Sequence, residues 1–164
     1  MTEVPLTQGR VAIIDGADSV SVCCYRWHAV FKGGKWYARR SGLVGEPTIV
    51  YMHHFILNPP NGYTADHIDG DGLNNQRFNL RAATQQQQCW NRRKKARSAY
   101  KGVSWQRNPR LAAGGYWRCT IQAPNGQIIS RSAKTQEAAA RIYNVLAQEY
   151  FGEFAWLNAL EAMA

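Results

Sequence analysis

Long hydrophobic runs are missing from this sequence of 164 residues. The longest apolar stretches lie at residues 48–52 and 55–57, far short of the roughly 20 residues that cross a bilayer. We therefore expect no membrane segment. The N-terminus also lacks a basic segment followed by an apolar one, which argues against secretion and favours the cytoplasm.

Cysteine is scarce, and its spacing suits neither zinc binding nor a disulfide framework. The four cysteines are Cys23, Cys24, Cys89 and Cys119, with no C-x-x-C pair among them. A tetrahedral zinc site built on cysteine needs such pairs. A chain of this length also needs no disulfide staples, and cysteine thiols fit a reducing compartment.

Acidic residues are few. There are 11 Asp and Glu against 20 Lys and Arg, which gives a net charge of +9. Such a balance favours a polyanionic partner, because a basic surface neutralises phosphates and releases their counterions. Charge alone is equally compatible with an ordinary basic protein, so the assignment depends on motifs.

The first third of the chain reads mainly as strand. Runs of β-branched and aromatic residues predict strands at 11–14, 27–31, 35–39 and 48–57, and Gly33-Gly34 predicts a hairpin turn between the middle two. Two further strands are expected at 63–68 and 78–83, separated by a turn-rich loop. Thr84, followed three residues later by Gln87, predicts the capped start of a helix that includes Gln88 and Asn91.

Several polar side chains around these last two strands suit phosphodiester hydrolysis. The reaction needs a base to activate water and a cation to neutralise developing charge. Asp66 is the expected anionic metal ligand and His67 the expected base, because a histidine is largely neutral at physiological pH. Asn79 is expected to buttress the loop and the ring through hydrogen bonds. Gln88 or Asn91 then supplies a further metal ligand or a phosphate contact from the helix.

Residues 2–95 resemble the HNH endonucleases, especially the homing and phage-encoded branch. The resemblance rests on VPLT (residues 4–7), VAIID (11–15), YMHHFIL (51–57), DHIDGDGLNN (66–75) and NLRAAT (79–84). It implies a ββα-metal fold with its core at about residues 62–95, in a nuclease domain of residues 1–96. In this fold Asp66 would bind the cation, His67 would be the general base and Asn79 the central structural asparagine.

The resemblance also extends to the leading histidine and to the metal. His53 matches that histidine, and we expect structural support from it rather than catalysis. The helix position that usually carries a metal-binding asparagine or histidine is here Gln88, with Asn91 one turn later. Oxygen-rich ligands favour Mg²⁺, with Mn²⁺ as a second candidate. The Asp69-Gly70-Asp71-Gly72 segment is expected to be a turn and not a calcium loop.

The pattern changes near residue 96, so we expect a second domain at residues 97–164. Strands are predicted at 103–105, 116–123 and 127–131, with Asn125-Gly126 as the turn between the last two. Thr135 is a credible N-cap for a final helix whose apolar stripe ends at Gly152. The expected class is α+β, with a three-stranded antiparallel sheet and one helix following the nuclease domain.

This second half resembles the DNA-binding domain of the Apetala/ethylene-response-factor family, through YKGVS (100–104), WRCTI (117–121), TQEAAARIY (135–143) and AWLN (155–158). The resemblance implies that the exposed face of the sheet enters the major groove of DNA. Trp117 is as well explained by core packing as by DNA contact. The residues expected to contact DNA are Arg92, Arg93, Lys94, Lys95, Arg97, Lys101, Ser104, Gln106, Arg107, Arg118, Thr120, Gln122 and Arg131. The basic run at 92–97 also fits a solvated helix end.

Together these features predict a metal-dependent endonuclease that nicks or cuts double-stranded DNA, as a monomer or homodimer, in a bacterial or phage-infected cell. A DNA-binding transcriptional regulator with a degenerate nuclease domain is the alternative, and Gln88 is its main support. A metal-dependent cleavage assay separates the two.

Overall fold

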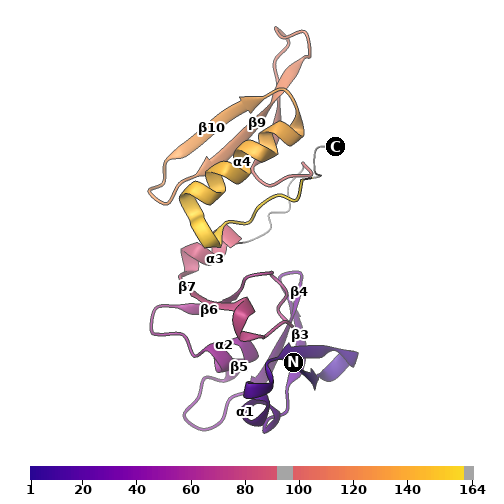
Figure 1. The fold of residues 1–164 in the computed structure, drawn as a ribbon, viewed down its shortest axis with the longest axis vertical. Helices are drawn as coiled ribbons and strands as arrows, with labels where there is room; N and C mark the ends of the chain where they lie inside the picture. The colour runs from indigo at the N-terminus through magenta and orange to yellow at the C-terminus, as the bar shows by residue number, and fades with distance from the viewer. Residues whose placement is uncertain (92–97, 161–164) are drawn as a thin grey trace. The chain divides into compact units, whose positions relative to one another are not determined.

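The computed structural model describes residues 1–91 and 98–160. The chain divides into two compact units, Met1–Gln88 and Cys89–Ala164, and the division falls within helix α3 (Gln85–Asn91). Small antiparallel sheets and a few helices make up both units (Figure 1), as expected for the α+β class. In the described part of the chain, no helix is long and apolar enough to cross a membrane.

The first unit begins with a hairpin of β1 (Thr2–Pro5) and β2 (Val11–Ile14). The sequence predicted β2 but not β1, because a four-residue strand that ends in proline carries little pattern. The short helix α1 (Ser19–Cys23) follows. It buries Val22 in the core of this unit, together with Ala12 and Ile14 of β2.

A three-stranded sheet comes next, formed by β3 (His28–Lys32), β4 (Lys35–Ser41) and β5 (Ile49–Tyr51) in that order. Gly33 and Gly34 form the β3–β4 turn with φ values of +62° and +84°. Such positive values favour glycine because it has no Cβ atom. The predicted hairpin is therefore present.

The strand predicted at residues 48–57 is wrong in its second half, which forms helix α2 (Met52–Leu57). Met52 and Ile56, four residues apart, both point into the core. That is helical spacing, which the β-branched and aromatic residues around it obscured. The helix ends at Asn58, whose φ of +47° is left-handed. His53 therefore lies on a helix and not on a strand.

Strands β6 (Thr64–His67) and β7 (Leu80–Ala83) pair antiparallel, and α3 follows β7 directly. The predicted capping box is present at the start of α3. The Thr84 backbone N–H donates to Gln87 Oε1 at 2.8 Å, and the Gln87 N–H donates to Thr84 Oγ1 at 3.3 Å. This reciprocal pair fixes where the helix begins, and therefore where Gln88 lies.

The second unit is a sheet in the order β10-β9-β8, built from β8 (Val103–Arg107), β9 (Gly115–Gln122) and β10 (Ile128–Ala133). Helix α4 (Gln136–Phe151) lies across one face of the sheet (Figure 1). The Ala138 N–H donates to Thr135 Oγ1 at 3.1 Å, as the N-cap prediction required. The turn at Asn125-Gly126 joins β9 to β10.

Alternation along the strands gives this sheet two unlike faces. Val103, Cys119 and Ile129 point toward α4, and together with Ala140 and Tyr143 of that helix they form the core of the second unit. The opposite face, which we call the outer face, carries the intervening side chains of the three strands. They are Ser104, Gln106, Tyr116, Arg118, Thr120, Gln122, Ile128, Ser130 and Ser132.

Candidate functional site

Strand β6 presents Asp66 and His67 in succession, so their side chains leave opposite faces of the strand. Asp66 lies opposite Arg81 on β7 and forms an ion pair with it at 3.1 Å. His67 is buried, with 6% of its surface exposed. Asp66 is therefore paired with a guanidinium, whereas His67 is withdrawn from solvent.

A hydrogen bond to Asn75 orients the His67 ring. His67 Nε2 lies 3.2 Å from Asn75 Oδ1, and Asn75 is fully buried. The Asn75 Nδ2 group donates to the Leu73 carbonyl at 3.0 Å, so the oxygen of this amide faces the ring as an acceptor. His67 Nε2 must then carry the proton, and the lone pair of the neutral ring is on Nδ1.

Burial keeps His67 neutral. Loss of solvent lowers the pKa of His67 below its ordinary value of 6.5, although the Asn75 bond and the charges of Asp69, Asp66 and Asp71 act in the opposite direction. A neutral imidazole accepts a proton, whereas an imidazolium cannot. The ring is thus in the protonation state that a general base requires.

His53 lies against His67, with ring centroids 4.6 Å apart. Its Nδ1 atom is buried with no hydrogen-bond partner, and burial lowers the pKa of His53 to about 2, with smaller contributions from His67 and His54. Tyr37 and Tyr51 pack on the same ring. His53 is therefore a neutral residue that packs behind the candidate base His67. His54 acts differently: its Nε2 accepts the Ala65 backbone N–H at 3.2 Å and so holds β6.

Asn79 braces the loop that joins β6 to β7. Its Oδ1 accepts the Asp69 backbone N–H at 3.0 Å, and its Nδ2 donates to Asp69 Oδ1 at 2.9 Å and to the Asn74 carbonyl at 2.8 Å. The side chain is buried, and its bonds go to the loop. In this structure it is Asn75, and not Asn79, that bonds the His67 ring.

The N-terminal segment also holds this loop, which sequence reasoning missed. The Ile13 N–H donates to the Leu73 carbonyl at 2.8 Å, and the Asn75 N–H donates to the Ile13 carbonyl at 2.7 Å. Asp15 accepts the Arg77 backbone N–H at 2.7 Å, and Asp18 pairs with the Arg77 guanidinium at 2.6 Å. The only local signal was a pair of aspartates directly after a predicted strand.

Gln88 lies on the same face of β6 as Asp66. Its Nε2 donates to Thr64 Oγ1 at 2.6 Å and to the Ala65 carbonyl at 3.2 Å, and Thr64 and Asp66 share a face by alternation. Because the amide nitrogen is committed to β6, the oxygen is the atom that can coordinate a cation. Asn91 belongs to the second unit, where it is buried with 7% exposed.

The donors available for a metal ion are oxygens. Among residues 1–91 and 98–160, no group of three or more His, Cys, Asp or Glu side chains is arranged to hold a metal. The predicted ligands Asp66 and Gln88 offer one carboxylate and one amide oxygen, which are the types of ligand that Mg²⁺ prefers. The Asp66 carboxylate is paired with the Arg81 guanidinium.

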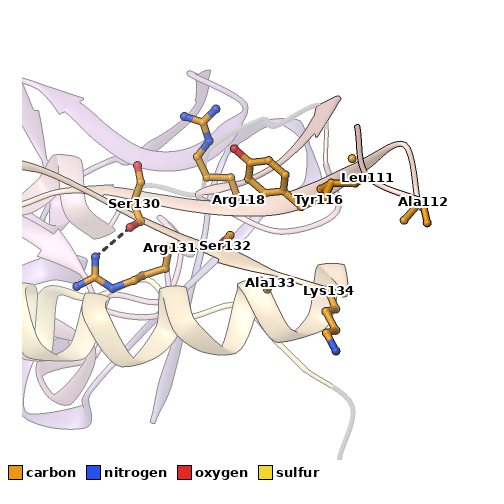
Figure 2. A pocket seen from close by; sticks show the side chains of 11 residues that line it. Leu111, Ala112, Tyr116, Arg118, Ser130, Arg131, Ser132, Ala133 and Lys134 are labelled. Carbon is orange, nitrogen blue, oxygen red and sulfur yellow. Dashed lines mark hydrogen bonds between the residues drawn. The ribbon is translucent and has the colours of Figure 1, made fainter. Parts of the chain in front are cut away.

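The outer face of the second unit carries five of the predicted DNA-contacting residues, namely Ser104, Gln106, Arg118, Thr120 and Gln122. Beside them lies an open hollow of about 790 Å³, between the β8–β9 connection and β10. Figure 2 shows Tyr116 and Arg118 standing on this side of the sheet, with Leu111 and Ala112 from the connecting segment. Arg118 donates to Gln106 Oε1.

Other predicted DNA contacts lie elsewhere. Lys101 donates through Nζ to the Trp90 carbonyl at 2.6 Å, and Arg131 lies on the α4 side of β10, where its guanidinium bonds the Ser130 carbonyl at 2.9 Å (Figure 2). Arg107 is exposed at the end of β8. Trp117 packs against the core beneath α4. Arg92, Arg93, Lys94, Lys95 and Arg97 lie outside the described residues.

Comparison with known proteins identifies the family. An uncharacterised HNH endonuclease of Acanthamoeba polyphaga mimivirus is 35% identical over 147 residues, which cover 83% of this chain and 72% of that protein. Protein 3.8 of Escherichia phage T7 is 38% identical over 98 residues, covering 58% of this chain and 76% of that protein. No family model and no solved structure matches. The chain belongs to the HNH endonuclease family.

Proposed function

We propose that this protein is a metal-dependent endonuclease that hydrolyses phosphodiester bonds in double-stranded DNA. The observation that carries the proposal is the buried His67 ring, which Asn75 holds on the strand that also carries Asp66. Membership of the HNH endonuclease family supports the nuclease chemistry. We assign this chemistry to residues 1–96.

His67 is the general base. With Nε2 bonded to Asn75, the ring takes the proton of the attacking water at Nδ1 and becomes an imidazolium that the Asn75 oxygen and nearby carboxylates stabilise. Asn79 holds the loop that carries Asn75, and His53 packs behind the ring. These two residues position the base and do not touch the phosphate.

Asp66 and Gln88 hold the cation, for which Mg²⁺ is the leading candidate and Mn²⁺ the second. When bound, the cation neutralises charge on the scissile phosphate and on the departing 3′ oxygen. Asp66 is the anionic ligand and Gln88 the neutral one. Asn91 is the less favoured ligand, because it is 7% exposed, whereas Gln88 is bonded to β6, the strand that carries Asp66.

The second unit grips DNA through its outer face, in the manner of the Apetala/ethylene-response-factor domain that residues 97–164 resemble. A strand pair fits the major groove, and Arg118 is the side chain there that matches guanine best. Ser104, Gln106, Thr120 and Gln122 supply weaker hydrogen bonds. The basic run at 92–97 adds phosphate contacts. The mimivirus match covers 83% of this chain and therefore extends beyond the first unit.

The test is plasmid nicking by the full chain with Mg²⁺, with chelator, and by His67→Ala and Asp66→Ala. We expect metal-dependent nicking by the wild type and a loss of about 100-fold or more in each variant, as for removal of a general base. Asn61→Ala, an exposed turn residue, serves as the control. Tight DNA binding without any metal-dependent nicking by the wild type would instead establish the transcriptional-regulator alternative.

A further inference from the structure

One face of the β3-β4-β5 sheet in the first unit is rich in positive charge. Lys35, Tyr37 and Arg39 alternate along β4 and therefore share this face. The register of β3 and β4 places Lys32 opposite Lys35, and His28 opposite Arg39. Lys32 is exposed, and Lys35 and Arg39 are half-buried. We call the surface formed by Lys32, Lys35, Tyr37 and Arg39 the basic face.

The carboxylates nearest to the basic face are bonded elsewhere. Residues 19–51 contain a single carboxylate, Glu46, and it is paired with Arg40, which points to the opposite face of the sheet. The β6–β7 loop carries Asp69 and Asp71, whose carboxylates accept hydrogen bonds from the loop itself. No carboxylate of residues 1–91 and 98–160 forms an ion pair with a cation of the basic face. The charge of this face therefore suits an anion from outside the chain.

Two like charges lie directly opposite each other at one end of the basic face. Lys32 and Lys35 flank the Gly33-Gly34 turn, and like charges in such a cross-strand pair destabilise the hairpin. An anion between the two ammonium groups would remove this repulsion. Arg39 lies about 14 Å farther along β4 than Lys35, because a strand rises about 3.4 Å per residue. Cations at both ends of such a strip fit an extended polyanion better than one small anion.

The basic face is continuous with the candidate active site. The Tyr37 ring, between Lys35 and Arg39 on β4, lies 6.1 Å from the His67 ring, measured between centroids. The β6–β7 loop also packs on this strand, so closely that a Cβ atom at Gly72 would collide with the Tyr37 ring. A polyanion that lies along the basic face therefore passes close to the proposed base.

We propose that the basic face binds the phosphodiester backbone of double-stranded DNA beside the bond that is cut. The proposal rests on the proposed function, which makes DNA the substrate and His67 the base. Lys32 and Lys35 hold phosphates at one end of the face and Arg39 holds them at the other, and none of the three takes part in the chemistry. Phosphate contacts carry no sequence information, so the basic face supplies affinity and orientation and not base recognition.

The first experiment measures how DNA binding by the full chain depends on salt, with chelator present so that no cleavage occurs. Each phosphate contact adds about 0.9 to the slope of log affinity against log salt concentration. We expect this slope to become shallower by about 2.7 in the triple variant Lys32→Gln, Lys35→Gln, Arg39→Gln, which loses three contacts. Arg39→Gln alone is compared with Arg10→Gln, which removes an exposed guanidinium that lies over Trp36 on the opposite face of the sheet. We expect a change of about 0.9 in the first and none in the second.

A slope for the triple variant equal to that of the wild type would overturn the proposal, with circular dichroism confirming that the variant is folded. The result does not depend on cleavage. A wild type that nicks plasmid with Mg²⁺ while the triple variant keeps its salt dependence would therefore leave the endonuclease function standing and reject only the basic face.

A second measurement uses the wild type and needs no substitution. The lysines are acetylated with and without a saturating short DNA duplex, again with chelator, and the modified peptides are quantified by mass spectrometry. We expect the duplex to slow the acetylation of Lys32 and Lys35 several-fold. Equally fast acetylation with and without DNA would overturn the proposal. Stronger protection by single-stranded RNA of the same length would assign the basic face to RNA and overturn it as well.

Discussion

The two units bury different kinds of side chain. In the first, the buried polar and charged residues are Asp18, Arg40, His53, His67, Asn75, Asn79 and Arg81. In the described part of the second, Asn91 is the only buried polar or charged residue, and the core consists of apolar side chains such as Val103, Ile121 and Tyr143. Among the described residues, buried polar side chains are therefore concentrated in the first unit.

The difference between a polar and an apolar interior has a physical meaning. A buried polar group costs free energy unless it is hydrogen-bonded, so a polar interior is retained where geometry must be fixed. Asn75, Asn79 and Asp18 each bond a neighbour around the β6–β7 loop. An apolar core needs no such matching and leaves an open sheet for a partner. Under the proposed function, the first unit would carry out the chemistry and the second would bind DNA through its surface.

The largest effect on stability is expected in the apolar core. Tyr143→Ala removes an aromatic side chain with 3% exposure from the packing between α4 and the sheet. Loss of a buried aromatic costs about 3–5 kcal/mol, measured as the free energy of unfolding in urea. Val145→Ala on the same helix, 67% exposed, is the control, with an expected change under about 0.5 kcal/mol. Equal losses in the two variants would contradict the assigned core.

For a buried polar residue of the first unit, we expect the main effect of a substitution to be on the rate of DNA nicking. Asn75→Ala removes the acceptor that orients the His67 ring, and loss of such a supporting bond lowers activity about 10- to 100-fold. Asn75→Asp keeps an acceptor at the same place and is expected to retain more of the rate. The measurement is the nicking rate at saturating DNA, with circular dichroism confirming that each variant is folded. If Asn75→Ala nicks DNA at the rate of the wild type, Asn75 does not support the His67 ring in the reaction.

Local sequence patterns predicted the elements whose signal lies within a few residues. The Gly33-Gly34 and Asn125-Gly126 turns and the Thr135 cap all formed as expected. Helix α2 was mistaken for a strand because its apolar run lacks a visible period. Strand β1 was missed because its pairing with β2 is what defines it. The structure of these two segments depends on tertiary contacts and not on local propensity.

Around the site, the motif directed attention to Asp66, His67 and Asn79, whose roles remain proposals. The contacts that hold them were harder to foresee. Asp15 reaches the Arg77 backbone across 62 positions of sequence, and Asp18 reaches the guanidinium of the same residue across 59. Asn75 was the second asparagine of a loop read as a turn. A pattern of residue types does not say which amide of an Asn-Asn pair faces inward.

The smallest expected effect concerns the Arg40–Glu46 ion pair, in which two guanidinium nitrogens meet two carboxylate oxygens, and it depends on pH. Arg40 is buried against Tyr25, and its hydrogen bonds hold the pKa of Glu46 at about 2, with help from the Leu43 N–H. A carboxyl whose pKa is lowered by folding stabilises the protein above its ordinary value of 4.5, and this contribution is lost as the pH falls toward 2. Glu46→Gln should therefore melt below the wild type at pH 7, and the gap should close on acidification. A melting difference that persists unchanged down to pH 2 would mean that the Glu46 charge is not what stabilises Arg40, and that this polar contact holds the first unit by shape alone.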